Sequence, residues 1–268
     1  MTKPELGLQG VRVLVTGASS GIGHAMADAL LRAGATVAAS ARPGARLDEA
    51  VQQWEEEGLP VRALPMDVRD PASVAVAHEE LADVWDSLDL LVNNAGLGMR
   101  TVNPRFVVEP KPFWEVPLEG FQDVLAVNCT GYFLVAKTFF PLLVAGTPGR
   151  IVNITMNHST MCRQGFVPYG PSRAAAESLS RIMAEDAKGA GVAVNMLLPG
   201  GATRTGMIPE ELPPSFEDSL LPPEIMGPPI VFLASSRAAG ITGERITASA
   251  WEAWCSEHGV DPTATVIK

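Results

Sequence analysis

The sequence predicts an α/β fold in which helices cover both faces of a doubly wound parallel sheet of about seven strands. Short runs of apolar β-formers alternate along the chain with longer helical segments, which is typical of parallel sheets with right-handed crossovers. A glycine-rich turn at residues 16–23 follows the first of these runs. The length of 268 residues and the hydrophobic content of 47% suit a single large domain over residues 1–268.

The amino-terminal elements alternate regularly. The run Val11 to Val15 is predicted as a buried parallel strand because it consists mainly of apolar β-formers. A helix from about Ile22 to Ala33 follows, and Gly34 closes it. By the same pattern the next elements are a strand at Thr36–Ala41, a helix at Leu47–Glu57, a strand at Val61–Met66, a helix at Pro71–Trp85 and a strand at Leu88–Asn93.

The carboxyl-terminal half continues the alternation with longer connections. Two proline-rich segments, Asn103 to Pro117 and Pro209 to Pro229, are predicted as long loops of the kind that often act as lids. The predicted elements are helices at Phe121–Leu143, Ser172–Lys188 and Ile225–Ala234, and strands at Arg150–Thr155, Val192–Leu197 and Glu244–Ala248.

Composition excludes several classes of function. Twenty Lys and Arg against thirty Asp and Glu give a net charge of −10, which argues against nucleic-acid and anionic-membrane partners. No run of about 18 uncharged apolar residues predicts a membrane span, and Met1 to Gln9 does not have the pattern of a signal peptide. Three scattered cysteines and four histidines predict no disulfide framework and no metal site. We therefore expect a cytoplasmic protein.

The glycine-rich turn predicts a nucleotide site. It reads Thr16-Gly17-Ala18-Ser19-Ser20-Gly21-Ile22-Gly23 and lies between the first strand and the first helix. Glycines in this setting allow a tight turn and let the backbone approach a pyrophosphate closely, so that the phosphate charge meets the helix amino terminus.

Three motifs together carry a family resemblance. The glycine turn, Asn93-Asn94-Ala95-Gly96 and the segment Tyr169-Gly170-Pro171-Ser172-Arg173 resemble the short-chain dehydrogenase/reductase family, across nearly the whole chain. The resemblance implies a Rossmann-type fold and an oxidoreductase that uses a nicotinamide cofactor on a small-molecule substrate. It also implies a homo-oligomer, a tetramer or a dimer, in which the helices predicted at 121–143 and 172–188 pair between subunits.

The resemblance also implies a cofactor preference. Ala41 occupies the position where NAD-preferring members carry Asp, and Arg42 the position where many NADP-preferring members carry Arg. We therefore expect NADP(H) to be preferred over NAD(H). The choice between Thr203 and Thr205 as the contact on the nicotinamide side stays open. The expected cofactor-binding residues are Gly17, Ser19, Ser20, Gly21, Ile22, Gly23, Arg42, Asp67, Val68, Asn94, Ala95, Gly96, Tyr169, Arg173, Pro199, Gly200 and Thr203.

The expected catalytic residues depart from the family pattern at two positions. Tyr169 matches the family's proton-transferring Tyr, and Asn128 matches the Asn that holds a relay water. Arg173 stands at the position of the family's Lys, and it keeps the positive charge but cannot release a proton near neutral pH. Met156 stands at the position of the family's Ser, and a thioether donates no hydrogen bond.

Three residues after Met156 could replace the missing donor, namely Asn157, His158 and Ser159. Thr155 is expected to point away, because alternate strand residues face opposite sides. Halohydrin dehalogenases share the fold and pair Tyr with Arg, but they need the Ser and lack the glycine loop. The alternative interpretation is therefore a non-redox or catalytically weak member of the same fold, either lyase-like or isomerase-like, or a binding or regulatory subunit.

The substrate side carries extra chain. The stretch from Asn94 to Asn128 is about ten residues longer than the usual family spacing, by comparison with the family pattern. It could form a substrate wall with carboxylate-binding arginines, or a surface loop that its aromatic residues pin to the body. The residues concerned are Arg100, Arg105, Phe106, Phe113 and Trp114. A second lid candidate runs over residues 206–229, and the sequence from Ala248 to Cys255 replaces the family's usual ending.

Overall fold

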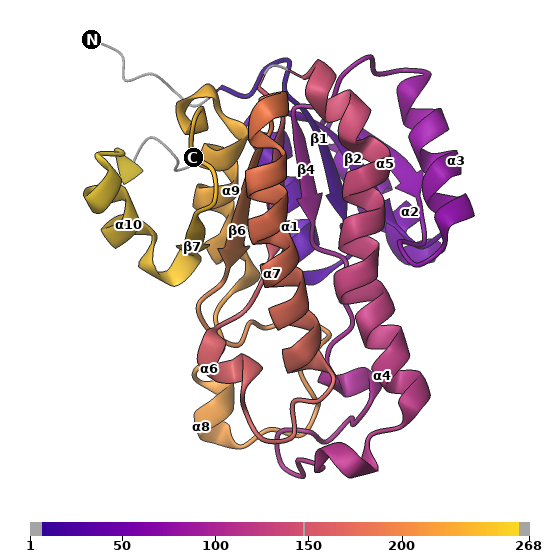
Figure 1. Ribbon diagram of the computed structural model, residues 1–268, viewed down its shortest axis with the longest axis vertical. Coiled ribbons are helices and arrows are strands. Elements are labelled where there is room, and N and C mark those ends of the chain that lie inside the picture. Colours follow the sequence, from indigo (N-terminus) through magenta and orange to yellow (C-terminus); the bar gives the residue numbers. More distant parts are fainter. Residues whose placement is uncertain (1–6, 147, 263–268) are drawn as a thin grey trace.

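The computed structural model describes residues 7–146 and 148–262 and contains one parallel sheet in the order β3-β2-β1-β4-β5-β6-β7 (Figure 1). This confirms the predicted fold. The strands are β1 (Arg12–Thr16), β2 (Thr36–Ala41), β3 (Val61–Pro65), β4 (Leu90–Asn93), β5 (Arg150–Ile154), β6 (Ala193–Leu198) and β7 (Arg245–Thr247). Most of the segment Met1 to Gln9 and the end of the carboxyl-terminal tail lie outside the described residues.

Helices cover both faces of the sheet, and each face has its own core. One core joins the sheet to α1 (Gly21–Arg32), α2 (Ala45–Glu56), α9 (Gly227–Ala234) and α10 (Trp251–His258). The other joins it to α3 (Pro71–Ala82), α5 (Gly131–Ala145) and α7 (Tyr169–Asp186). The central strands have apolar residues on both faces because both faces are covered, which explains their nearly continuous apolar runs.

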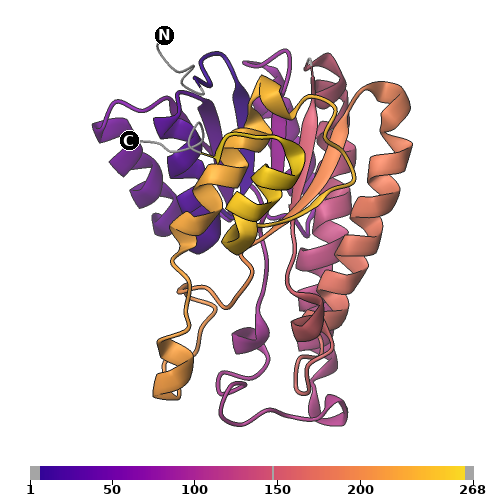
Figure 2. The ribbon, with the colours of Figure 1, turned by 90° about the vertical axis from the view of Figure 1, so that its left-hand side faces the viewer.

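The loops that follow the strands extend well beyond the sheet at one end of the molecule (Figures 1 and 2). They carry three short helical elements, α4 (Leu118–Leu125), α6 (His158–Met161) and α8 (Pro214–Glu217). The strand order reverses between β1 and β4, where crevices for ligands form in doubly wound sheets. Single 3-10 turns occupy Met99–Thr101, Phe113–Glu115, Lys188–Ala190, Pro223–Met226, Ser236–Ala238 and Ala248–Ala250.

Some element boundaries differ from the sequence prediction. The helix predicted at 121–143 is α4 and α5 joined by a π-helical turn at Ala126–Thr130, so the helical segment runs from Leu118 to Ala145. Helix α7 begins at Tyr169 and not at Ser172. Helix α10 was not predicted, although its Trp251 and Trp254 stack on each other and contact Phe232 of α9.

The helical segment Leu118–Ala145 is long and apolar enough to cross a membrane by length and composition alone, with a mean hydropathy of 1.4 over its most apolar window. Half of that window is buried against the rest of the protein, and α5 supplies Val135 and Phe139 to the core. A mostly buried core helix passes the same test, so this observation is weak evidence for a span. The three cysteines are all free.

Candidate active site

The glycine-rich turn leaves β1 and enters α1 with a backbone that only glycine accommodates easily. Gly17 and Gly21 have φ angles of +68° and +58°, in the left-handed region that favours glycine. A Cβ added at Gly23 would lie 2.2 Å from the carbonyl oxygen of Gly17, so a side chain there would push the turn open. These two constraints produce a tight turn beside the amino terminus of α1.

The Asn94-Ala95-Gly96 turn is fastened to this glycine turn. The Thr16 hydroxyl accepts hydrogen bonds from the backbone N–H of Asn94 at 2.9 Å and of Ala95 at 3.0 Å. The Asn94 amide in turn donates to the carbonyl of Thr16 at 2.9 Å. Asn94 therefore joins the end of β4 to the end of β1, across the point where the strand order reverses.

The end of β2 is open to solvent beside an acidic group. Arg42 is exposed, and its charge helps to lower the pKa of Asp67. The main cause of that lowered pKa is Arg69, whose guanidinium donates to the Asp67 carboxylate at 2.8 Å. Sequence reasoning did not single out Arg69, which also pairs with Asp123 of α4 at 3.3 Å. Val68 is buried and touches the position of Gly131.

The turn after β6 approaches the glycine turn from the other side. Gly200 has a φ of +96°, and a Cβ there would collide with the Ser249 hydroxyl. Thr203 is buried and forms a bridge with Leu221. The methyl of Thr205, by contrast, lies 3.1 Å from the place where a Cβ on Gly21 would stand. Thr205 is thus the threonine that reaches the glycine turn.

These features fit a dinucleotide. The glycines leave room for a phosphate at the amino terminus of α1, where Ser20 makes no side-chain cap. The backbone N–H groups of that first turn are therefore available to an anion. The neighbouring turns at Asn94 and at Gly200 flank the same end of the sheet, and the exposed Arg42 stands at the end of the next strand.

Tyr169 opens α7, and Arg173 lies one turn further along the same helix. Arg173 is buried, with 3% of its surface exposed. Its Nη1 donates to the Tyr132 hydroxyl at 2.6 Å and to the carbonyl of Ile154 at 2.9 Å. Its Cζ lies 5.4 Å from the centre of the Tyr169 ring, within the range of a cation–π contact. Sequence reasoning did not single out Tyr132.

The Arg173 guanidinium remains protonated despite its burial. Burial alone would lower the pKa of the guanidinium, but electrostatic interactions and hydrogen bonds with Tyr132 and Tyr169 raise that pKa above its ordinary value. A positive charge therefore stands beside Tyr169 at every working pH.

Asn128 lies in the π-helical turn and ties three segments together. Its carbonyl oxygen accepts from the Leu97 N–H at 2.8 Å, and its amide donates to the carbonyl of Leu97 at 2.9 Å and to the Ser172 hydroxyl at 2.9 Å. Ser172 donates to the carbonyl of Tyr169 at 2.8 Å. The widened turn thus connects the loop after β4 to the helix that carries Tyr169.

Met156 forms part of an apolar wall on the other side of Tyr169. Met99, Phe106 and Phe166 make a buried cluster, and Met156 and Tyr169 pack against it. The rings of Phe106 and Phe166 meet edge to face with centroids 5.6 Å apart. One surface of Tyr169 therefore faces apolar atoms, while another faces the Arg173 guanidinium.

The residues around Met156 are engaged elsewhere. The Asn157 amide donates to the carbonyl of Gly200 at 2.9 Å, and His158 lies 2.8 Å from a carboxylate oxygen of Glu177. Thr155 donates to the other Glu177 oxygen at 3.1 Å. Ser159 is exposed on α6.

Glu177 was missed by sequence reasoning and organises this segment. Burial alone would raise the pKa of its carboxyl, but hydrogen bonds from His158 and Arg245 hold that pKa down at about 2. Arg245 also donates to the carbonyl of Met156 at 2.6 Å. No sequence motif marks Glu177, because its partners Thr155, His158 and Arg245 come from the loop after β5, from α6 and from β7.

The extra chain after β4 meets the second predicted lid. Arg100 donates to Glu210 at 2.7 Å and to the carbonyl of Gly206 at 3.2 Å, and Arg105 donates to Glu211 at 3.4 Å. The two arginines proposed as carboxylate binders therefore have carboxylate partners within the chain.

The aromatic residues of the extra chain divide into two groups. Phe106 is buried against the apolar wall, as a residue that pins a loop would be. Phe113 and Trp114 are 68% and 72% exposed and contact each other edge to face. Neither belongs to the apolar cluster against which Tyr169 packs.

Comparisons with known proteins agree with this geometry. The family model described as short chain dehydrogenase matches residues 11–213. The 3-oxoacyl-(acyl-carrier-protein) reductase of Aquifex aeolicus is 30% identical over 250 residues, which are 90% of this chain and 97% of that protein. Gluconate 5-dehydrogenase of Gluconobacter oxydans is 33% identical over 201 residues, 75% of each chain.

A solved structure shows the same fold in detail. The Pseudomonas aeruginosa RhlG/NADP active-site complex is 30% identical and superimposes with a TM-score of 0.79, covering 92% of this chain and 97% of that one. The chain therefore belongs to the short-chain dehydrogenase family. Its relatives are named dehydrogenases and reductases, so the chain is an oxidoreductase of that family.

Proposed function

We propose that this protein is an NADP(H)-dependent oxidoreductase with an atypical active site, formed by one domain over residues 1–268. It transfers hydride to or from a small-molecule carbonyl or alcohol, or an activated C=N or C=C group. The observation that carries the proposal is the position of Tyr169, at the start of α7, between a buried guanidinium and an apolar wall. A phenol in that position can exchange a proton with a substrate oxygen.

The preference for NADP(H) rests on the end of β2. Ala41 offers no carboxylate to a ribose 2′-hydroxyl, and the exposed Arg42 next to it can reach a 2′-phosphate. The Asp67 carboxylate is already paired with Arg69, which limits its repulsion of a phosphate. The RhlG complex with NADP is consistent with this preference.

Each remaining residue has a distinct part in the proposal. The bound nicotinamide supplies or accepts the hydride. Tyr169 donates its proton to the substrate oxygen during reduction, or takes it back during oxidation. Arg173 stabilises negative charge on that phenol, and Asn128 fixes the loop beside it. Met156 offers an apolar surface where the family pattern has a hydroxyl.

The lack of a donor at Met156 restricts the substrates. An oxyanion that loses one donor loses roughly 3–4 kcal/mol of transition-state stabilisation. Neither Asn157 nor His158 replaces it, since both side chains bond to other groups. We therefore favour substrates with an apolar substituent, or with an electrophile that is already polarised, such as an iminium ion. The same observation supports the second candidate, a catalytically weak or non-redox member of the family.

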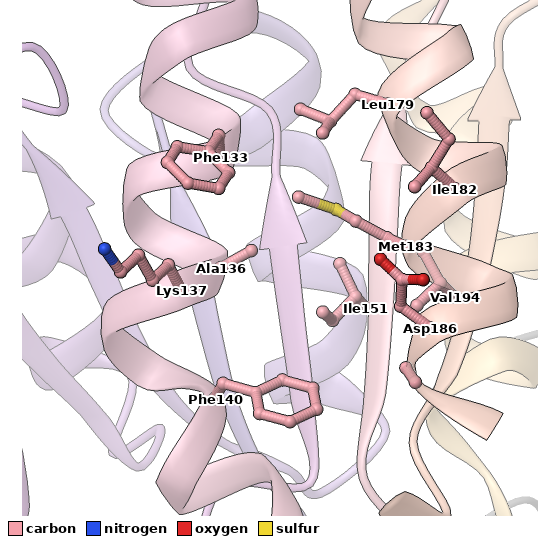
Figure 3. Close-up of a pocket in the computed structure, with 11 residues that line it drawn as sticks. Phe133, Ala136, Lys137, Phe140, Ile151, Leu179, Ile182, Met183, Asp186 and Val194 are labelled. Carbon is pink, nitrogen blue, oxygen red and sulfur yellow. The ribbon is translucent and has the colours of Figure 1, made fainter. Parts of the chain in front are cut away.

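We further propose a homo-oligomer that pairs α5 and α7 between subunits. These helices border an apolar groove of about 270 Å³, lined by Phe133 and Phe140 from α5 and by Leu179, Ile182 and Met183 from α7 (Figure 3). Phe133 is 46% and Ile182 55% exposed, and both line this groove, so they form part of a contiguous apolar patch of the kind that marks an interaction surface. Sedimentation should give a dimer or tetramer at micromolar concentration, and a species of 28.3 kDa alone would contradict it.

The function is tested by following NADPH absorbance with a panel of ketones, iminium ions and enones. We expect turnover of at least one class, and Tyr169→Phe should reduce turnover of a ketone by about 10²–10⁴-fold. The same variant should spare most of the turnover of an iminium ion, which needs no proton on oxygen. Unchanged ketone turnover by Tyr169→Phe would exclude Tyr169 as the acid. No NADPH consumption with any class would favour the non-redox candidate.

A further inference from the structure

The strongest unexplained feature of the site is the environment of Arg173. This arginine is almost completely buried, yet within residues 7–146 and 148–262 no carboxylate pairs with it. A buried charge without an anionic partner is costly unless hydrogen bonds and polarisable groups surround it. The structure must therefore hold this guanidinium by other means.

Two aromatic rings and two acceptors do so. The Cζ of Arg173 lies 5.6 Å from the ring centre of Tyr132 and 5.4 Å from that of Tyr169. Its Nη1 donates to the hydroxyl of Tyr132 and to the carbonyl of Ile154. The chain contains only two tyrosines, and the guanidinium contacts both.

Gly96 closes the third side. A Cβ added at Gly96 would lie 2.4 Å from Nη2 of Arg173, so the guanidinium occupies the space that a side chain would take. The Nε of Arg173 is buried without a hydrogen-bond partner. The guanidinium therefore has little freedom to move further inward, and its position depends on the bonds made by Nη1.

We infer that Tyr132 is a positioning residue that holds the Arg173 guanidinium against Tyr169 and so lets an arginine serve beside the proton-transferring phenol. The inference rests on the proposed function, in which Tyr169 is the acid and base. A guanidinium is planar and needs acceptors in fixed directions, unlike an ammonium group on a flexible stem. The Tyr132 hydroxyl supplies such an acceptor at 2.6 Å, from a helix different from the one that carries Arg173.

The place of Tyr132 in the sequence explains how it reaches this point. It follows Asn128 by four residues across the π-helical turn, and the two side chains contact neighbouring residues of α7, Arg173 and Ser172 respectively. Tyr132 is buried, and its hydroxyl donates to the carbonyl of Ile154 at 3.3 Å. Desolvation raises the pKa of Tyr132, so it remains a neutral hydroxyl that can accept from Arg173.

Tyr132 does not itself have access to a substrate. Its side chain is enclosed, and its proton is directed at a backbone carbonyl. Its effect must therefore pass through Arg173, and this distinguishes it from a second proton donor.

The two tyrosines make the test direct, because the absorbance of tyrosinate near 295 nm reports only on them. In Tyr132→Phe the remaining signal belongs to Tyr169. Without cofactor or substrate, we expect Tyr169 to ionise about one pH unit higher in Tyr132→Phe than the earlier of the two transitions in the unaltered protein. The reason is that the Arg173 guanidinium, no longer positioned by the Tyr132 hydroxyl, stabilises the phenolate less well. The control variant Ser180→Ala removes another buried hydroxyl, which lies on α7, and should leave both transitions unchanged.

A double-variant cycle shows whether Arg173 carries the effect. Arg173→Met removes the charge, and adding Tyr132→Phe to it should then produce no further change in the titration of Tyr169. An additive change, or no change in Tyr132→Phe alone, would overturn the inference. If Tyr132→Phe does not fold, Gly96→Ala displaces the guanidinium from the opposite side, and it should move the earlier transition in the same direction. No movement in Gly96→Ala would also overturn it.

The titrations, taken together with the turnover of Tyr169→Phe, distinguish a failure of the proposed function from a failure of the role inferred for Tyr132. If Tyr169→Phe retains full ketone turnover, the proposed function fails while the coupling of Tyr132 to Tyr169 can still be measured. If the coupling is absent but Tyr169→Phe is inactive, only the role of Tyr132 is wrong. Where turnover is found, the pH–rate profile of Tyr132→Phe should shift in the same direction as its titration, with the KM for NADPH changed less than kcat.

Discussion

The nucleotide side and the reacting side of this protein are built in different ways. On the nucleotide side, the shape of the site is determined by the path of the backbone at Gly17, Gly21 and Gly23, between β1 and α1. On the reacting side, side chains from separate segments meet, as where Arg173 of α7 contacts Tyr132 of α5. The first arrangement is local in sequence, and the second joins residues 41 positions apart.

Because of this difference, we expect amino-acid substitutions to be tolerated less well in the glycine turn than in the side-chain cluster. A backbone turn with left-handed glycines has few substitutes, because other residues are strained there. A cluster of side chains can be rebuilt, provided that the partners change together. The reacting side therefore holds an arginine with a tyrosine partner and a methionine in an apolar wall, while the glycine turn keeps its usual form.

The sharpest way to break the nucleotide side is Gly23→Ala. Its Cβ would lie 2.2 Å from the Gly17 carbonyl oxygen, a backbone atom that can move only if the turn opens. We expect NADPH affinity in calorimetric titration to fall by about 3 kcal/mol, roughly 100-fold. Gly189→Ala is the control, because nothing lies within 4 Å of a Cβ there. Binding by Gly23→Ala within about twofold of the unaltered protein would contradict this account.

The same contrast explains how much the sequence could predict. The strands, the glycine turn and the turn at Asn94 were predictable because each has a local signal, either an apolar run or a fixed set of small residues. Helix α10 was missed because its tryptophans stabilise it through contact with α9, which no local pattern records. The start of α7 was placed three residues late, since Pro171 within its first turn resembles a break.

Within the site, the residues that sequence reasoning missed are those whose partners are distant. Tyr132 and Glu177 have no motif, and their importance follows only from the atoms that they contact. A substrate wall with Arg100 and Arg105 was one of two interpretations of the extra chain, and the structure pairs both arginines with glutamates of the second lid. A charge in a sequence indicates that a partner is needed, and the fold decides which partner it is.

The apolar wall on the reacting side can be tested with Met156→Ser. If a ketone is the native electrophile, the added hydroxyl supplies the missing donor, and we expect kcat for ketones to rise by about tenfold or more. Met156→Ala removes the thioether without adding a donor and serves as the matched control. For an iminium ion the serine should bring no gain. A lower ketone rate in Met156→Ser than in Met156→Ala would show that a donor at this position does not help.

A smaller effect is expected at the edge of the nucleotide side, where a side chain rather than the backbone selects the cofactor. Arg42→Ala should weaken NADPH binding by about 1.5 kcal/mol, roughly tenfold, because an exposed charge-assisted bond to phosphate is lost. Binding of NADH should hardly change. Arg46→Ala, an exposed arginine on α2, controls for the general loss of charge. Equal or tighter binding of NADH by the unaltered protein would exclude the preference itself.

The smallest expected effect concerns Glu177, which fastens the Met156 segment to α7 and β7. The folded state holds the pKa of this carboxyl at about 2, below its ordinary value of 4.5, so its contribution to stability is present above pH 4.5 and is lost as the pH falls towards 2. Because His158 and Arg181 are more than half exposed, solvent screens their interaction with Glu177, and we expect the free energy of unfolding to fall by only about 1 kcal/mol.

The measurement is denaturant unfolding between pH 5 and pH 2. The free energy of unfolding should fall less steeply with pH in Glu177→Gln than in the unaltered protein. Glu185→Gln, whose exposed carboxylate pairs only with Lys188 in the ion pairs of the described chain, should leave the slope unchanged. Equal slopes in Glu177→Gln and the unaltered protein would mean that the reacting side does not depend on this carboxylate for its stability.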